Sequence, residues 1–305
     1  MTDRPRRSAV VLCGGKSTRM GRPKALLPWR GSTLIESIVG VLESLVDEII
    51  VVSHESLRLP ALVARVPLRV VVDRVPGLGP LAGIREGLAA ATAERAFVTS
   101  ADAPFLEPAF VQALFDRPGA VAPKVDGFVQ PIAAVYPTAL AALAAELLAA
   151  ERRRPLWLLE AAGYSSLGAA ELPGLRSLTN LNTPADYLAA LATDAVERAH
   201  PLSPACVVMR GQARARAGAD EVAAEVGTLA QIGTRLDLRF PELRLIVGGA
   251  VSPDYRLWFA ACGFAHDLHM PIGPGERVEV RDAPPPALGD SSGREAATGP
   301  RVGRE

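Results

Sequence analysis

The chain has 305 residues, 49% hydrophobic and 22% charged, and its formal net charge is zero. That is enough for one large folded domain or two ordinary ones. A balanced charge argues against a protein that coats nucleic acid or lies on a membrane surface, since such proteins carry a basic excess. A small acidic substrate remains compatible, because a local basic cluster can bind it.

The N-terminal residues and the cysteines show no sign of export. No apolar run of about 7–15 residues follows the charged start, so we expect no signal peptide. No apolar stretch approaches the ~20 residues of a membrane helix. The cysteines, Cys13, Cys206 and Cys262, stand far apart. They indicate neither a disulfide framework nor a paired-cysteine metal site, so we expect a reducing, cytoplasmic setting.

The first part of the chain alternates strand-like and helix-like segments. Its strand candidates are short apolar runs without polar alternation, as in strands buried on both faces of a parallel sheet. They are Ala9–Leu12, Glu48–Ser53, Leu68–Asp73 and Ala96–Ser100, and helices are predicted between them at Ser32–Val46, Pro80–Ala91 and Pro108–Phe115. This alternation predicts a layered α/β domain with a mainly parallel sheet.

The pattern continues and then changes. A strand is predicted at Val129–Tyr136, and helices at Thr138–Ala150, Pro155–Ala162 and from Pro184 to about Arg198. We place the first domain at residues 1–198 and a proline-containing linker at 199–204. A small α+β domain is predicted at 205–282. Its expected strands lie in "CVVMRG", "LRLIVGG" and "ERVEVRD", and its expected helix, capped by Thr228, lies in "GTLAQIGTRLDLRF". Residues 283–305 have no apolar pattern and are predicted to be disordered.

The stretch "GGKST" after the first strand resembles the end of a phosphate-binding P-loop. A P-loop needs G-x-x-x-x-G-K-[ST]. With Gly15 as its second glycine, the first would fall on Val10, inside the strand. The spacing therefore excludes a P-loop.

The segment still has the chemistry of a phosphate site. Two glycines end the strand and let the backbone approach a ligand closely. Four cations follow within a short loop: Lys16, Arg19, Arg22 and Lys24. Loops at the carboxyl ends of parallel strands are where open α/β sheets bind ligands, so this loop is predicted to bind a phosphate chain rather than to be a solvated basic loop.

Two further loops fit the same edge of the sheet. "GLGPLAG", Gly77–Gly83, is a weak match to a dinucleotide fingerprint, and Pro80 starts a helix at once, so we reject a nicotinamide or flavin site there. In "FVTSADAPF", Asp102 directly follows a strand. A carboxylate there, facing a phosphate loop, is a natural Mg²⁺ ligand. Taken without the other loops, Asp102 would be interpreted as a turn aspartate.

Together these stretches resemble the molybdenum cofactor guanylyltransferases, which have a Rossmann-like nucleotidyltransferase fold. The family opening L-x-G-G-x-S-x-R-M-G-x-x-K stands complete as "LCGGKSTRMGRPK", Leu12 to Lys24. "GPLAGI", "ADAPF", "VQPIAAVYP" and "NLNTPADY" match later family motifs in the same order, and the resemblance extends to about Leu191. One departure is Ala101, where the family usually has cysteine.

The resemblance implies a role for each matched residue. The guanine nucleotide would be met by Leu12, Cys13, Gly14 and Gly15, and its phosphates would be held by Arg19 and Lys24. Asp73 would lie on the guanine side, and Asp102 would bind Mg²⁺. The pterin would be faced by Asn180 and Asn182. The implied reaction is attack by the molybdopterin phosphate on the α-phosphorus of GTP, with release of pyrophosphate. The implied substrates are GTP and molybdenum-loaded molybdopterin.

Two alternatives remain open from the sequence. A cytidylyltransferase of the same cofactor has this fold but usually carries Ala-Ala-Gly in the first loop, whereas this chain has Cys13-Gly14-Gly15. A non-catalytic carrier or scaffold of the cofactor pathway is the other alternative. The presence of Arg19, Lys24 and Asp102 favours the enzyme.

The C-terminal domain resembles, more weakly, the β-grasp sulfur-carrier subunit of molybdopterin synthase, through Gly218–Leu243 and Gly273–Val280. The carrier's terminal Gly-Gly is missing, because Gly248-Gly249 is internal. We therefore expect a degenerate module that either docks pathway proteins or apo-molybdoenzymes or is a structural appendage. Cys262, His266 and His269 have a spacing that is possible for a metal site on a helix, but a fourth ligand is missing. A structural zinc site usually needs four ligands, so we do not predict zinc there.

Overall fold

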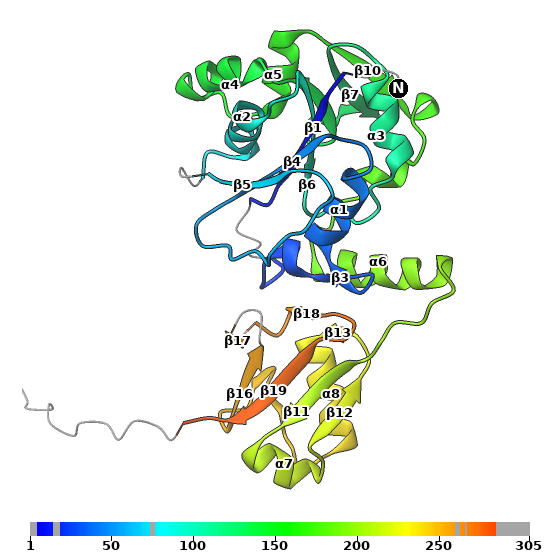
Figure 1. The fold of residues 1–305 in the computed structure, drawn as a ribbon. Coiled ribbons are helices and arrows are strands. Elements are labelled where there is room, and N and C mark those ends of the chain that lie inside the picture. The colour runs from blue at the N-terminus through cyan, green and yellow to red at the C-terminus, as the bar shows by residue number, and fades with distance from the viewer. Residues whose placement is uncertain (1–4, 15–18, 74–76, 260–262, 266, 285–305) are drawn as a thin grey trace, which may run out of the picture.

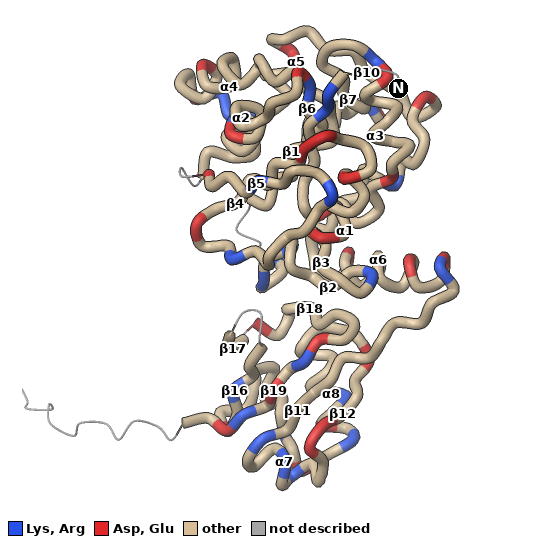
Figure 2. The backbone as a smooth tube through the Cα atoms, viewed as in Figure 1, with Lys and Arg blue, Asp and Glu red and all other residues tan. Residues whose placement is uncertain are grey.

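The computed structural model describes residues 5–14, 19–73, 77–259, 263–265 and 267–284. They form two units, each with its own sheet and hydrophobic core (Figure 1). No helix within these ranges has the length and apolar character needed to cross a membrane. Positive and negative residues are interspersed along both units (Figure 2).

The larger unit is built on an eight-stranded sheet in the order β10-β7-β9-β6-β1-β4-β5, with β8 paired to β7. Strands β6, β1, β4 and β5 are mutually parallel, and β9 runs against its neighbours. The strands are β1 (Arg7–Leu12), β4 (Glu48–Ser53), β5 (Leu68–Val72), β6 (Arg95–Ser100), β7 (Ala120–Val125), β8 (Phe128–Val129), β9 (Ala134–Pro137) and β10 (Tyr164–Gly168). The predicted α/β class with a mainly parallel sheet is confirmed.

Helices cover both faces of this sheet, as alternation along β1 requires. Ala9 and Val11 pack against α1 (Leu34–Leu42) and α3 (Pro108–Phe115). Val10 and Leu12 pack on the other face, against α2 (Pro80–Ala90), α4 (Leu140–Ala149) and α5 (Pro155–Ala162). All four of these β1 residues are buried, so apolar side chains occupy both faces of the strand.

A third apolar cluster lies beside the sheet and joins segments far apart in the chain. It includes Met20, Leu27, Trp29, Leu181 and Tyr187. Met20 and Leu27 flank the turn η1 (Lys24–Leu26), Trp29 belongs to β2 (Pro28–Trp29), which pairs with β3 (Ser32–Thr33), and Tyr187 belongs to helix α6 (Pro184–Glu197). The turns η2 (Ala169–Glu171) and η3 (Leu175–Leu178) precede α6. This cluster supports the segment that carries the predicted phosphate-binding cations.

The smaller unit has a five-stranded mixed sheet in the order β12-β11-β19-β16-β17. Its elements are β11 (Ala205–Met209), α7 (Gly211–Ala217), β12 (Glu221–Ala224), β13 (Gly227–Thr228), α8 (Leu229–Arg239), β14 (Ile246–Val247), β15 (Ala250–Val251), β16 (Tyr255–Phe259), β17 (Gly263–Ala265), β18 (Pro271–Ile272) and β19 (Arg277–Asp282). Thr228 caps α8 as expected. A small C-terminal β-rich domain is thus present, and its likeness to a sulfur carrier stays a prediction.

Several elements differ from their sequence-based expectation. Helix α1 is shorter than Ser32–Val46, because Ser32 pairs with Trp29 in the β2–β3 hairpin and Thr33 caps the helix. The strand expected at Val129–Tyr136 is broken into β8 and β9, since Pro131 lacks the N–H that a continuous ladder needs. Helix α7 was not expected.

The predicted strand "LRLIVGG" is also corrected. Only Ile246–Val247 is a strand, β14, and Gly248 and Gly249 form the two-residue turn of the β14–β15 hairpin. Both glycines have positive φ, +58° and +77°, which such a turn favours.

One buried carboxylate ties β4 to its surroundings. Glu48 accepts hydrogen bonds from the Ser8 hydroxyl (2.6 Å) and from the Thr92 N–H (2.5 Å) and hydroxyl (2.8 Å), and it pairs with Arg69 (2.8 Å). Desolvation alone would raise its pKa, but these bonds and one from the Ala93 N–H lower the pKa of Glu48 to about 2. A carboxyl with a lowered folded-state pKa stabilises the fold above its unfolded pKa, and that contribution is lost as pH falls from about 4.5 toward 2.

We predict that Glu48→Ala lowers the free energy of unfolding by about 2 kcal/mol at pH 7, because buried donors lose their acceptor. The difference from wild type should shrink below pH 4.5. Urea unfolding followed by circular dichroism at several pH values measures both effects. Glu197→Ala, which removes one partner of an exposed ion pair, is the control and should change stability little. An equal loss in both variants would contradict the role of Glu48.

Candidate active site

The candidate site lies where β1, β4 and β6 end. Because these strands are parallel, their carboxyl ends meet at one edge of the sheet, where open α/β folds bind ligands. The chain leaving β1 is held on both sides: the Cys13 N–H donates to the Val52 carbonyl (2.8 Å), and the Ala101 N–H donates to the Leu12 carbonyl (3.0 Å). Gly14 follows and is exposed, and Gly15 lies outside the described residues.

At this edge three of the predicted site residues meet. The Lys24 ammonium is 2.8 Å from Asp102 Oδ2 and donates to Asn182 Oδ1 at 3.2 Å. Lys24 and Asp102 are both about four-fifths buried. The other carboxylate oxygen, Asp102 Oδ1, accepts from the Ser100 hydroxyl. The structure thus joins the loop after β1, the loop after β6 and the segment before α6.

The loop that carries Asn182 is fixed by the start of α6. Asp186 accepts hydrogen bonds from the N–H groups of Asn182 (2.9 Å) and Thr183 (2.8 Å), and Thr183 in turn caps the helix. Desolvation acts to raise the pKa of Asp186, but these bonds and the charge of Lys24 hold it below its usual range. A charged Asp186 therefore keeps Asn182 next to Lys24.

The remaining predicted residues lie around this centre. Arg19 is exposed and directly follows the undescribed residues 15–18. Asp73 directly follows β5, and its N–H donates to the Ser53 carbonyl. Because β5 lies two strands from β1, Asp73 is about 10 Å from β1 across the sheet. Asn180 lines a cavity of about 110 Å³ together with Thr99 and Gln130. Asp73 therefore lies further along the sheet edge, whereas Asn180 adjoins Leu181, whose N–H donates to the Asp102 carbonyl (3.0 Å).

Comparison with known proteins assigns much of the larger unit to one family. The profile of the MobA-like NTP transferase domain matches residues 9–162. The chain belongs to this family. Probable molybdenum cofactor guanylyltransferases from Bacillus mycoides (strain KBAB4) and Bacillus cereus (strain AH820) are 33% and 32% identical over 190 residues each, which is 60% of this chain and 94% of each relative.

A solved structure agrees with the fold. Molybdopterin-guanine dinucleotide biosynthesis protein A from Archaeoglobus fulgidus is 25% identical and superposes with a TM-score of 0.50, covering 62% of this chain and 99% of that one. The chain is therefore a MobA-like nucleotidyltransferase enzyme with a role in cofactor biosynthesis.

Three polar residues of this MobA-like site were not predicted from the sequence: Ser100, Gln130 and Asp186. Ser100 and Gln130 stood inside quoted motifs, "FVTSADAPF" and "VQPIAAVYP", but a hydroxyl or an amide at a strand end carries no signal of its own. Asp186 could have been found, because Thr183-x-x-Asp186 has the spacing of a helix capping box.

Asp102 is suited to hold a divalent cation only together with a substrate. Among the described residues, no group of three or more His, Cys, Asp or Glu side chains could hold a metal ion. Mg²⁺ is commonly bound by one or two carboxylates and the phosphates of a nucleotide. One carboxylate beside a cation-rich loop fits that arrangement. Of the zinc candidates, Cys262 and His266 lie outside the described residues.

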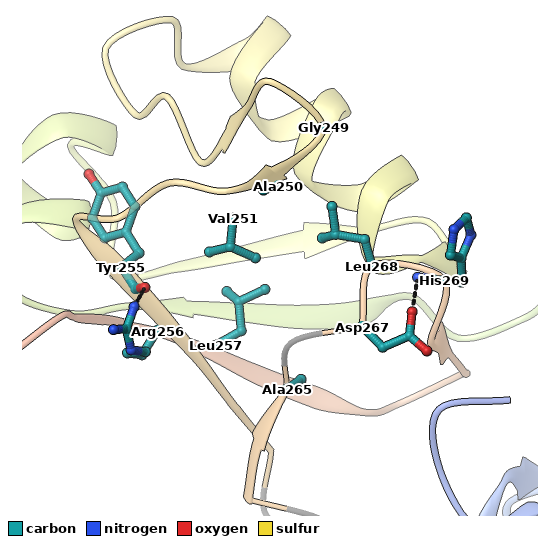
Figure 3. A pocket seen from close by; sticks show the side chains of 10 residues that line it. All are labelled: Gly249, Ala250, Val251, Tyr255, Arg256, Leu257, Ala265, Asp267, Leu268 and His269. Atoms are coloured by element: carbon teal, nitrogen blue, oxygen red, sulfur yellow. Dashed lines mark hydrogen bonds between the residues drawn. The ribbon is translucent and has the colours of Figure 1, made fainter. Parts of the chain in front are cut away.

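A larger cavity, of about 410 Å³, is lined by residues of the smaller unit (Figure 3). Val251, Leu257 and Leu268 contribute its apolar wall. Two polar groups on its lining bond locally: Asp267 accepts from the His269 N–H (2.9 Å), and Arg256 donates to the Tyr255 carbonyl (3.1 Å). Since no motif residue lines it, we place the chemistry at the Lys24–Asp102 pair and not in this larger cavity.

The Cys13 thiol lies at the edge but is not a nucleophile. Cys13 is buried, and desolvation, reinforced by the negative charge of Asp102, raises its pKa to about 12. Only a thiolate attacks an electrophile effectively. Cys13 can therefore serve a ligand only through its backbone.

We predict that iodoacetamide at pH 8 modifies Cys13 on the order of a thousandfold more slowly than a free cysteine, because almost none of it is thiolate. Peptide mass spectrometry after timed labelling measures this rate. The same peptide labelled in denaturant is the control and should react fully. Labelling of native Cys13 at the rate of a free thiol would refute its burial and raised pKa.

Proposed function

We propose that the protein transfers GMP from GTP to molybdenum-loaded molybdopterin and releases pyrophosphate. The observation that carries this proposal is the meeting of Lys24, Asp102 and Asn182 at the carboxyl edge of the sheet. It joins a cation of the signature loop, a candidate metal-binding carboxylate and a candidate pterin-side amide in one cluster. The guanylyltransferase names of the relatives support the choice of reaction.

In the proposed reaction an oxygen of the molybdopterin phosphate attacks the α-phosphorus of GTP. A new phosphorus–oxygen bond forms, and the bond between the α-phosphorus and the bridging oxygen to the β-phosphate breaks. The attacking oxygen already carries charge, so the protein need not supply a nucleophile. Its task is to align two polyanions and reduce their repulsion.

Residues of the chain divide this task. Lys24, held by Asp102 and Asn182, would neutralise nucleotide phosphates, and exposed Arg19 would add a second cation from the same loop. The backbone of Leu12–Gly14 would approach the nucleotide, with Asp73 further along the edge toward the base. Asn180 and Asn182 would bind the acceptor pterin beside the cavity that Gln130 lines.

Asp102 would hold Mg²⁺ jointly with the phosphates of the bound nucleotide. When bound, Mg²⁺ would draw off negative charge at the reacting phosphate. Asp102 contacts Lys24 at 2.8 Å, so a carboxylate and an ammonium group lie next to each other. This supports an arrangement in which Mg²⁺ on Asp102 and the Lys24 ammonium would both face the nucleotide phosphates.

Other features of the proposal come from the sequence alone. Preference for GTP over CTP rests on Cys13-Gly14-Gly15 in the first loop, and the cytoplasmic location stays a prediction. The domain boundaries, on either side of a linker at residues 199–204, also rest on the sequence. We further infer that the C-terminal unit is a degenerate β-grasp module for docking pathway proteins or apo-molybdoenzymes, since Gly248-Gly249 forms a hairpin turn and not a chain end.

The reaction is tested by incubating the full chain with molybdenum-loaded molybdopterin, Mg²⁺ and either GTP or CTP. We expect pyrophosphate and the guanine dinucleotide product with GTP, quantified by a coupled assay and mass spectrometry. Pyrophosphate from neither nucleotide would sink the enzyme assignment and favour the scaffold alternative. A preference for CTP would replace the guanylyl assignment by the cytidylyl one.

We predict that Asp102→Asn lowers kcat/KM for GTP by about 10²-fold or more, because a charged group facing the reacting phosphates is lost. The fold should be retained, as thermal unfolding will show. Asp116→Asn is the matched control: Asp116 is exposed at the end of α3 and bonds to Gln112 of the same helix. Wild-type turnover by Asp102→Asn would remove Asp102 from the proposed metal-binding role.

A further inference from the structure

The smaller unit packs directly against the segment that carries the signature cations. In Figure 1 its β13–β18 end faces β3 and α6 of the larger unit. Residues 267–276 of the smaller unit meet residues 21–28 and Tyr187 of the larger one. The contact therefore falls on the same loop that contains Arg19 and Lys24.

A buried ion pair links the two units. Arg22 Nη1 is 2.7 Å from Glu276 Oε2, and the two side chains are only 1% and 14% exposed. The Arg22 guanidinium also donates to the Pro271 carbonyl (3.4 Å), and Glu276 Oε2 accepts from the Gly273 N–H (2.8 Å). A guanidinium buried this deeply needs its carboxylate partner, since an unpaired buried charge is strongly unfavourable. Here the partner belongs to the other unit.

The backbone of the smaller unit also approaches side chains of the larger unit closely. Gly273 lies against Tyr187 and Pro28: a β-carbon placed there would be 2.2 Å from the Tyr187 hydroxyl oxygen and 3.0 Å from the Pro28 ring. The Tyr187 hydroxyl donates to the Pro28 carbonyl (2.7 Å). Desolvation, with a further contribution from the Glu276 charge, raises the pKa of Tyr187. This part of the interface has no room for a side chain at position 273.

Gly21, which directly precedes Arg22, also packs closely against the smaller unit. Its φ is +69°, a conformation that favours glycine. A β-carbon there would lie 2.9 Å from Asp267 Oδ2 and 3.2 Å from Met270 Cβ. Gly21 and Arg22 are thus both held by the smaller unit.

The signature segment is consequently held from two sides. On one side Lys24 pairs with Asp102 and Asn182 of the larger unit. On the other, Arg22, two residues earlier, pairs with Glu276. Between them the chain turns into η1, and the Leu27 N–H donates to the Lys24 carbonyl (3.0 Å). A shift at Arg22 is transmitted to Lys24 through only two peptide units.

We propose that the smaller unit positions the nucleotide loop, with Glu276 as the positioning residue that acts through Arg22 on Arg19 and Lys24. This inference rests on the proposed function of those two cations. A loop already held in its binding conformation loses less entropy when the nucleotide binds. By thermodynamic linkage, nucleotide binding in turn stabilises the packing of the smaller unit on the loop.

The test compares Glu276→Gln with Glu221→Gln in the full chain. Glu221 pairs with Arg277 within the smaller unit, and both are half exposed, so this control removes the same charge away from the interface. For Glu276→Gln we expect the Kd and KM for GTP to rise about fivefold or more, with kcat within about twofold of wild type. Glu221→Gln should match wild type. A fall in kcat alone would argue for a direct catalytic role and against positioning.

A second variant avoids the charges. Gly273→Ala leaves Arg22 and Glu276 in place but inserts a methyl group where Tyr187 and Pro28 leave no space. We expect the same increase in Kd for GTP. In both variants amide hydrogen exchange of residues 19–29 should be faster than in wild type, and in wild type GTP should slow exchange of residues 267–276.

Unchanged exchange in residues 19–29 and unchanged affinity for GTP in folded Glu276→Gln and Gly273→Ala proteins would overturn the proposal. Absence of transfer by the wild-type protein would instead refute the proposed function. The exchange measurement does not depend on turnover, so the two failures are distinguishable.

Discussion

The parallel pairing of β6, β1 and β4 is the constraint on which the candidate site depends. Leu12 pairs with Val52 on one side and Ser100 on the other, so the chain segments that follow all three strands begin at the same edge. Apolar side chains on both faces of β1, from Ala9 to Leu12, require helices above and below and exclude solvent from this strand. Without that register, Lys24 and Asp102 could not meet.

The edge is assembled from short polar contacts backed by apolar packing. Asp102 is oriented by Ser100, Asn182 by Asp186, and Lys24 by both Asp102 and Asn182. Beneath them the cluster around Met20, Leu27 and Trp29 anchors the signature segment to α6. The acidic, basic and amide groups therefore hold one another in set positions, as the proposed alignment of two polyanions would require.

Much of the fold could be predicted because its signals are local. Buried strands show as apolar runs, and helices show as apolar spacing or capping residues such as Thr228 before α8. The prediction failed where one local signal overrode another and where distant contacts decided the outcome. Ser32 pairs with Trp29 in a hairpin, so α1 begins later than expected. Pro131 interrupts the run of apolar residues that predicted a single strand. The role of Arg22 could not be foreseen, because Glu276 is 254 residues away in the chain.

The sequence by itself determined the α/β class and the main strands and helices from β1 to α3, since these follow from apolar periodicity, and its motifs singled out Lys24, Asp102 and Asn182 as candidate site residues. Only the tertiary structure decided which of the loop cations face the site. Lys24 turns toward Asp102, whereas Arg22, identical in charge and two residues away, is buried against the smaller unit. The physical reason is that a cation's role depends on which carboxylate it meets, and both carboxylates come from distant parts of the chain.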